Sequence, residues 1–179
     1  TALVRSRLSW KALRGVTPTD EAVVLFTSGS ESLPKAVPLT HANILTNVRD
    51  TFAAVELLDR DVLIGMLPPF HSFGIVVTTI LPLCSGFRTV YHPNPTEAAV
   101  LARVVAEYRV TVLVGTPTFL NGIVRVAQPG QLDSLRLAVT GAEKCSDAVY
   151  QALSRACPNA TILEGYGITE CSPIVSATL

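Results

Sequence analysis

Short apolar runs alternate along this chain with longer segments in which apolar residues recur every three or four positions. A near-continuous apolar run rich in β-branched residues is typical of a strand buried on both faces, whereas the longer spacing is typical of a helix. Regular alternation of the two predicts an α/β fold, with a largely parallel β-sheet flanked by helices on both faces. The predicted strands are Ala22–Phe26, Asp61–Leu67, Arg88–His92, Val110–Val114, Leu135–Thr140 and Thr161–Glu164.

Each predicted helix begins at a residue that favours a helix start. Thr40 caps the first, which runs to about Leu58 with Ile44, Leu45, Val48, Phe52 and Val55 on one face. The others are an apolar helix from Phe73, one capped by Thr96 with Val100, Leu101, Val104, Val105 and Tyr108 at helical spacing, one starting at Pro117, and one capped by Ser146 that ends near Cys157. Thr27–Pro38 and Pro68–Ser72 are predicted loops. Residues 1–20 are expected to form a peripheral lead-in, and residues 21–179 part of an α/β domain.

Composition excludes several classes of protein. Hydrophobic residues make up 49% of the 179 residues and charged residues 16%, so the chain is not disordered. Fourteen basic residues balance fourteen acidic ones, which gives no electrostatic reason to expect a nucleic-acid partner. The longest apolar stretch, Phe73–Leu83, is about half a membrane span, so no transmembrane segment is expected. Four cysteines without C-x-x-C spacing and three scattered histidines predict neither a zinc site nor a disulfide.

The start of the chain bears on where the protein works. It has no pattern typical of a signal peptide, so we expect a cytoplasmic protein. The chain begins at Thr1 and its only methionine is Met66, which favours an excised piece of a longer protein. Inner-membrane association would then come through other domains of the full-length protein.

The strongest local signal is the polar loop after the first predicted strand. Its notable residues are Thr27, Ser28, Gly29, Ser30 and Lys35. Small residues let backbone N–H groups approach an anion, hydroxyls add donors and the lysine supplies positive charge, which together suit a triphosphate. The loop is not of the Walker type, because the positions of G-K-[ST] counted from Gly29 hold Pro34, Lys35 and Ala36. An ordinary polar turn between a strand and a helix is the alternative.

This loop resembles that of the adenylate-forming superfamily, T-S-G-[ST]-[TE]-G-x-P-K-G, which includes acyl-CoA synthetases, luciferases and peptide-synthetase adenylation domains. Glu31 resembles the acyl–acyl carrier protein synthetase branch, which is fused to a lysophospholipid acyltransferase. Ser32 and Ala36 stand where glycines are usual, which costs roughly 1 kcal/mol or more wherever φ is positive. The resemblance implies that the ATP phosphates are bound by Thr27, Ser28, Gly29, Ser30, Glu31 and Lys35.

Two more segments match the superfamily at its other motifs. Pro68–Gly74 resembles P-x-F-H-x-x-G, which implies that Phe70, His71 and Phe73 border an acyl substrate. A simple helix-capping loop is the alternative. Gly165–Glu170 matches Y-G-x-T-E, which implies that the Tyr166 ring lies against adenine and that Thr169 donates to the α-phosphate. Glu170 would hold Mg²⁺, a cation that prefers carboxylate oxygen, with Thr27 as a further ligand; a glycine-rich strand exit is the alternative.

A weaker match is the turn Gly141–Glu143, which resembles G-[AG]-[EA]. The resemblance implies an adenine site formed by Gly141, Ala142, Glu143, Gly165 and Tyr166. Its value lies in the order of the segments, which is that of the superfamily over residues 20–176.

The implied reaction is attack of a fatty acid on ATP, with Thr169, Glu170 and Lys35 as catalytic residues and Mg²⁺ as cofactor. The acyl group would then pass to acyl carrier protein or, as the alternative, to coenzyme A. A ribose-binding aspartate and a C-terminal domain with the adenylation lysine are expected beyond Leu179, so the isolated piece should have little activity. A nucleotide-binding module without chemistry, or a scaffold domain that no longer binds ATP, are the rival functions.

Overall fold

The centre of the molecule is a six-stranded sheet in the order β4-β3-β5-β6-β7-β8. The structure is a computed structural model and describes residues 17–27, 33–86 and 88–178. The strands are β3 (Val62–Gly65), β4 (Arg88–Tyr91), β5 (Val112–Gly115), β6 (Leu137–Thr140), β7 (Thr161–Gly167) and β8 (Ile174–Ala177). The strands from β4 to β7 are parallel, and β8 returns antiparallel to β7. The predicted mainly parallel sheet is therefore confirmed; β8 was not predicted.

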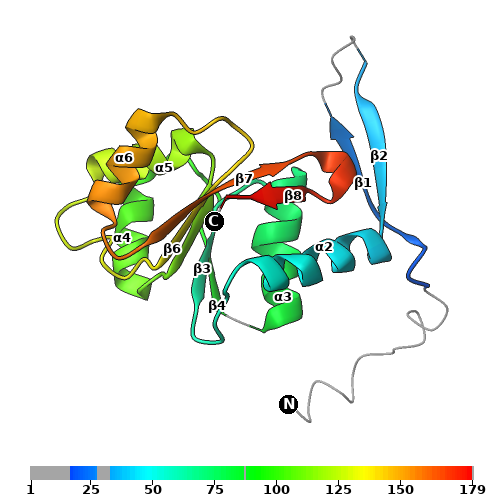
Figure 1. Ribbon diagram of the computed structural model, residues 1–179, viewed down its shortest axis with the longest axis horizontal. Helices are drawn as coiled ribbons and strands as arrows, with labels where there is room; N and C mark the ends of the chain where they lie inside the picture. The colour runs from blue at the N-terminus through cyan, green and yellow to red at the C-terminus, as the bar shows by residue number, and fades with distance from the viewer. Residues whose placement is uncertain (1–16, 28–32, 87, 179) are drawn as a thin grey trace.

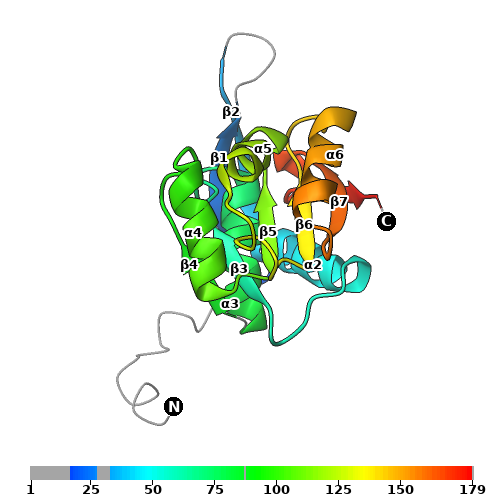
Figure 2. The same ribbon diagram turned by 90° about the vertical axis from the view of Figure 1, so that its left-hand side faces the viewer.

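Helices cover both faces of this sheet (Figures 1 and 2). On one face lie α4 (Ala98–Tyr108), α5 (Pro117–Val126) and α6 (Asp147–Ala156), and on the other α2 (His41–Ala54), η2 (Gly74–Ile80) and α3 (Leu81–Ser85). Alternate residues of one strand feed different cores: Leu63 packs on the α2 side, while Val62 and Ile64 pack on the α4 side. Burial of both faces explains why the central strands are near-continuous apolar runs.

The first predicted strand is present, but it does not belong to the central sheet. Glu21–Thr27 is β1, which pairs antiparallel with β2 (Lys35–Thr40) in a separate two-stranded sheet. Leu25 is buried, but Val24 and Phe26 are 45% and 71% exposed, so the strand is not buried on both faces. The loop predicted to extend to Pro38 ends at Pro34, and β2 follows it. An apolar run on a hairpin has the same local pattern as a central parallel strand, which is why the sequence could not separate them.

Most of the predicted helix starts are confirmed. Thr40 caps α2 in a capping box with Asn43, Pro117 is the first residue of α5, and Ser146 caps α6. The cap at Thr96 is wrong, because α4 begins at Ala98 and the Thr96 hydroxyl instead bonds to Asn94 at 2.7 Å. The predicted face of α2 is also partly wrong: α2 ends at Ala54, and Leu45 and Phe52 are 51% and 40% exposed.

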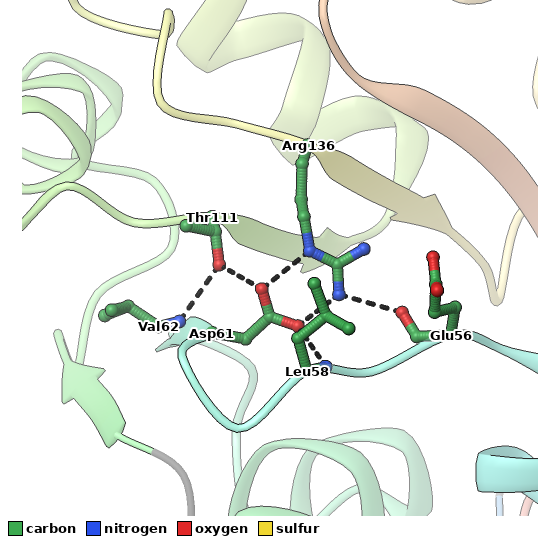
Figure 3. Close-up of polar contacts among 6 residues, drawn as sticks. All are labelled: Glu56, Leu58, Asp61, Val62, Thr111 and Arg136. Carbon is green, nitrogen blue, oxygen red and sulfur yellow. Dashed lines mark hydrogen bonds and ion pairs between the residues drawn. The ribbon is translucent and has the colours of Figure 1, made fainter.

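A buried ion pair ties together the amino ends of the central strands (Figure 3). Asp61 precedes β3 and is 1% exposed. Its carboxylate accepts hydrogen bonds from Arg136 Nε at 2.7 Å, Arg136 Nη2, Thr111 Oγ1 at 2.7 Å and the Leu58 amide at 2.7 Å. Burial by itself would raise the pKa of Asp61, but these hydrogen bonds and the charge of Arg136 hold it below its ordinary value. The cluster lies at the amino ends of β3, β5 and β6, whereas the predicted site lies at the carboxyl ends of the strands.

None of the helices in the described part of the chain is both long and apolar enough to cross a membrane.

Candidate active site

The predicted site segments gather at the carboxyl ends of the parallel strands, where ligands bind in sheets of this kind. The loop 66–73 follows β3, the turn 141–146 follows β6, and the 3₁₀ helix η3 (Thr169–Cys171) follows β7. The Gly141 amide donates to the Gly115 carbonyl at 3.1 Å, so the turn after β6 is joined to the end of β5. In this way the strand order brings together segments that are distant in the sequence.

One cavity, of about 460 Å³, connects these segments. It lies between the sheet and the helices α2, η2 and α3, and its polar end is formed by the loops just described. Residues of the predicted motifs that line it are His71, Ser72, Phe73, Gly141, Ala142, Gly165, Tyr166 and Thr169. Its inner wall is apolar and is formed by Val77, Leu81, Val112, Val114, Leu137, Val139 and Leu163.

The turn at Gly141 packs closely against Phe73 and the end of β7. A Cβ at Gly141 would lie 3.2 Å from the Phe73 ring and 3.3 Å from the Gly165 carbonyl, which is tighter than most Cβ contacts. Ala142, which also lines the cavity, adopts a φ of 65° in the left-handed region. The Tyr166 side chain is 61% exposed, so its ring is available for stacking.

Two hydrogen bonds hold the loops around this end of the cavity. The hydroxyls of Ser72 and Thr169 lie 3.2 Å apart and join the loop after β3 to η3. The Cys145 amide donates to Glu164 Oε1 at 3.0 Å and joins the turn after β6 to β7. Burial, with the carboxylates of Glu164 and Asp147, raises the pKa of the Cys145 thiol above its ordinary value. Cys145 is therefore a neutral thiol at pH 7.

The phosphate loop is described only at its two ends. Ser28, Gly29, Ser30, Glu31 and Ser32 lie outside the described residues. Thr27 ends β1, Lys35 begins β2, and the two face each other across the hairpin. Strand β2 lies against η3 (Figure 1). The strand β2 and the turn that contains Glu170 are therefore neighbours.

A magnesium ion at Glu170 would need the phosphates of a bound nucleotide as further ligands. No group of three or more His, Cys, Asp or Glu side chains among the described residues could hold a metal. Glu170 is exposed, and none of the ion pairs within the described ranges involves it. Mg²⁺ bound to a nucleotide typically uses one or two carboxylates and completes its shell with phosphates and water. A single open carboxylate beside Thr169 fits that requirement.

Two predicted contacts differ from the geometry. Phe70 is 74% exposed and does not line the cavity, unlike His71 and Phe73. The Glu143 carboxylate accepts a hydrogen bond from the Thr118 hydroxyl at 2.7 Å and lines a second cavity, of about 370 Å³, between α5 and α6. Glu143 therefore lines the second cavity and not the first.

Sequence reasoning missed Ser72 and Asn47. Both line the cavity and hydrogen-bond to the segment 169–174. The available signal for Asn47 was a polar side chain one turn before Thr51 on a helix whose buried residues are Ile44 and Val48.

Comparisons with known proteins agree with this geometry. The profile of the family described as AMP-binding enzyme matches residues 5–179. The chain is 30% identical to a long-chain-fatty-acid–CoA ligase of Yersinia pestis over 98% of its length, and 30% identical to 4-coumarate–CoA ligase 3 of Arabidopsis thaliana over 89%. It spans 32% and 29% of those two relatives.

Solved structures give the same result. A protein of Rhodopseudomonas palustris described as a long-chain-fatty-acid CoA ligase superposes with a TM-score of 0.80 at 27% identity, over 90% of this chain and 39% of that one. ATP-bound MatB from the same organism superposes with a TM-score of 0.74 at 27% identity, over 90% of this chain and 32% of that one.

Proposed function

The chain belongs to the family of AMP-binding enzymes, and on that premise we propose that it activates a fatty acid with ATP, as an acyl-adenylate, for transfer to a thiol. A carboxylate oxygen attacks the α-phosphorus of ATP, the bond from that phosphorus to the bridging oxygen breaks, and pyrophosphate leaves. No proton needs to move in this step. The protein must align the attacking and leaving oxygens and balance the negative charge on the phosphates.

Each motif has a proposed part in that alignment. The backbone at Gly141–Glu143, with Gly165 and the Tyr166 ring, binds adenine, and Thr169 donates to the α-phosphate. The loop Thr27–Glu31 and Lys35 bind the β- and γ-phosphates. Bound Mg²⁺ would supply positive charge to the phosphate oxygens, with Glu170 and Thr27 as its protein ligands. His71 and Phe73, which line the cavity, border the reacting carboxylate.

The observation that supports a fatty acid is the continuity of the cavity. Its polar end contains the nucleotide motifs, and its inner wall is formed by apolar residues of the sheet, η2 and α3. A volume of about 460 Å³ is within the usual range for small-molecule sites. Each methylene buried there contributes about 0.8 kcal/mol, so an alkyl chain binds without any charged partner. An amino-acid substrate would need an ionic partner for its ammonium group. The apolar inner wall has none, and Asp50, the acidic residue among the described residues that line the cavity, is paired with Arg49 at 2.9 Å.

The thiol acceptor is proposed to be the phosphopantetheine of an acyl carrier protein, because Glu31 resembles that branch of the superfamily. Coenzyme A is the second candidate, since relatives that match the chain are named as CoA ligases. Both thiols should be offered to the full-length protein after adenylate formation. Acylation of the carrier protein alone would support the first acceptor, and acyl-CoA alone would support the second.

We further propose that the chain works as part of a longer ligase, since it spans about a third of the length of its relatives. The 179 residues by themselves should then bind ATP weakly and catalyse little. Attachment to the inner membrane would come through other domains.

Fatty-acid-dependent exchange of pyrophosphate into ATP tests the proposed function. In the full-length protein, Glu170→Gln should lower the rate by about 100-fold or more, because charge stabilisation is lost at the phosphates. Glu107→Gln, on the exposed surface of α4, is the matched control and should leave the rate unchanged. A wild-type protein that binds Mg·ATP in a calorimeter but exchanges no pyrophosphate would be a binding module instead.

A further inference from the structure

Asn47 forms three hydrogen bonds with main-chain groups next to the catalytic turn. Its side-chain amide donates to the Cys171 carbonyl at 3.2 Å and to the Ile174 carbonyl at 2.8 Å. Its amide oxygen accepts from the Ile174 N–H at 3.3 Å. The side chain therefore pairs with Ile174 through both a donor and an acceptor, as a neighbouring strand would. Of the natural side chains of this length, only asparagine offers both groups.

The helix that presents Asn47 is itself well anchored. The Thr40 hydroxyl accepts from the Asn43 amide at 3.1 Å, and the Asn43 side chain accepts from the Thr40 amide at 3.0 Å, which closes the first turn of α2. Ile44 and Val48, on either side of Asn47 in the sequence, are buried in the core. Because α2 follows β2 directly, it is linked without a loop to the strand that begins at Lys35.

The segment that Asn47 holds has few other external supports. Within it, the Ile168 amide bonds to the Pro173 carbonyl at 2.9 Å and the Cys171 amide to the Ile168 carbonyl at 3.0 Å, so the turn closes mainly on itself. From outside, the Ser72 hydroxyl meets Thr169 at one end, and Asn47 meets Cys171 and Ile174 at the other. Asn47 thus supports the side of the turn that lies toward β2.

We infer that Asn47 is a positioning residue that sets the place of Thr169 and Glu170 relative to β2, the strand that begins at Lys35. This inference rests on the proposed function. The proposed α-phosphate and metal ligands Thr169 and Glu170 lie on η3, whereas Lys35, a proposed ligand of the β- and γ-phosphates, begins β2. Asn47 connects β2 with η3, because its helix follows β2 directly and its side-chain amide hydrogen-bonds to the main chain on both sides of Ser172. Asn47 touches none of the reacting atoms in this scheme.

A residue that merely stabilises the fold would behave differently. Removing the amide of Asn47 should let the turn 168–174 shift, which misplaces Thr169 and Glu170 together. Misplacement by about 1 Å can lower a rate on the order of 100-fold even when substrate binding elsewhere is intact. The substitution should therefore lower kcat and weaken the binding of Mg·ATP. The KM for the fatty acid, which binds at the other end of the cavity, should stay within about twofold of wild type.

The test compares Asn47→Ala with Asn43→Ala in the full-length protein. Asn43 lies on the same helix, and its side-chain oxygen accepts two hydrogen bonds from Thr40, from the amide at 3.0 Å and from the hydroxyl at 2.8 Å, whereas none of its side-chain hydrogen bonds goes to residues 168–174. We expect Asn47→Ala to lower kcat for pyrophosphate exchange at least about tenfold. Amide hydrogen exchange over 168–177 should also rise at least about tenfold, because all three hydrogen bonds of the Asn47 side chain are lost. Asn43→Ala should loosen the start of α2 and leave both readouts unchanged.

Asn47→Asp separates donor from acceptor. It is nearly isosteric, keeps the oxygen that accepts from Ile174 and loses both donated hydrogen bonds, so kcat should fall while the Ile174 amide stays protected. Two results for Asn47→Ala would overturn the inference. One is faster amide hydrogen exchange over 168–177 with an unchanged kcat for pyrophosphate exchange, and the other is a lower kcat with unchanged amide hydrogen exchange. Calorimetry with Mg·ATP separates the two proposals. If the wild type exchanges no pyrophosphate, the proposed function fails, but Asn47→Ala must still bind Mg·ATP about tenfold more weakly than Asn43→Ala, or the positioning role fails as well.

Discussion

The hydroxyls of Ser72 and Thr169 lie 3.2 Å apart although 97 positions separate the two residues in the sequence. Ser72 is 5% exposed and belongs to the loop after β3, and Thr169 begins η3 after β7. The contact joins the segment proposed to border the carboxylate to the residue proposed to donate to the α-phosphate. These are the two groups that react in adenylate formation.

Replacing Ser72 by alanine should therefore slow adenylate formation with little effect on folding. Loss of one neutral hydrogen bond is worth about 1 kcal/mol, or roughly fivefold in kcat. Thr169→Val removes a donor to the reacting phosphate itself and should cost on the order of 100-fold. Pyrophosphate exchange measures both. Ser134→Ala is the control. That serine also makes one hydrogen bond, to the Val110 carbonyl at 2.8 Å, but it lies near the amino ends of β5 and β6, at the end of the sheet away from the site.

A larger side chain at Val77 should shorten the fatty acid that the protein accepts. Val77 is 7% exposed and lines the apolar wall of the cavity. Val77→Phe should raise KM for long-chain acids about tenfold or more and change KM for short acids by less than about twofold. A chain-length series in the pyrophosphate-exchange assay gives the result. Val126→Phe, at an exposed position away from the cavity, should not alter the series; equal effects of both variants would contradict the assignment of this wall.

Asp61→Asn should destabilise the protein strongly and leave the chemistry of the site intact. The substitution leaves the guanidinium of Arg136, with a side chain 27% exposed, without its carboxylate partner. Breaking such a largely buried pair costs about 3 kcal/mol. Thr111→Val removes one hydrogen bond from the same cluster and should cost about 1 kcal/mol. Urea unfolding measures both values, and similar losses in the two variants would argue against the ion pair as the main interaction.

The same cluster should make stability depend on pH in the acid range. The pKa of Asp61 is lowered on folding from its ordinary value of 3.8, so the native state favours the charged carboxylate. Its contribution is complete above pH 3.8 and is lost as the pH falls below that value through the lower native pKa. Unfolding curves between pH 5 and pH 2, in steps of about half a unit, should show this loss in the wild type. The Asp61→Asn variant should lack that part of the dependence.

Cysteine reactivity should report on nucleotide binding. Cys171 and Cys84 are exposed, whereas Cys157 is 1% exposed and burial raises its pKa to about 11. At pH 8 an alkylating reagent should modify Cys171 and Cys84 and leave Cys157 unmodified. Mg·ATP should then slow modification of Cys171, which follows Glu170, and leave the rate at Cys84 unchanged. Mass spectrometry of the labelled peptides measures this, and equal protection of both thiols would contradict a nucleotide at η3.

The sequence was a good guide wherever the physical cause is local. The strand runs β3, β5 and β6 could be predicted because each is buried on both faces. The caps Thr40 and Ser146 could be predicted because each binds an amide three residues away. The motif segments were found at the ends of those strands for a related reason: a parallel sheet places its carboxyl ends together. Where local causes compete, the pattern was misleading, as at Thr96, whose hydroxyl bonds to Asn94 instead of capping α4.

What the sequence determined by itself was the alternation of strands and helices, and with it the parallel sheet and the end of the sheet where a site must lie. Only the tertiary structure decided that the apolar run at Val24–Phe26 belongs to a hairpin with one exposed face, and that β8 forms an antiparallel edge strand of the sheet. It also decided that Asn47 hydrogen-bonds to a turn 124 or more positions away. These features depend on contacts between distant segments. No spacing within a short window of sequence reflects which residues will meet after the chain has folded.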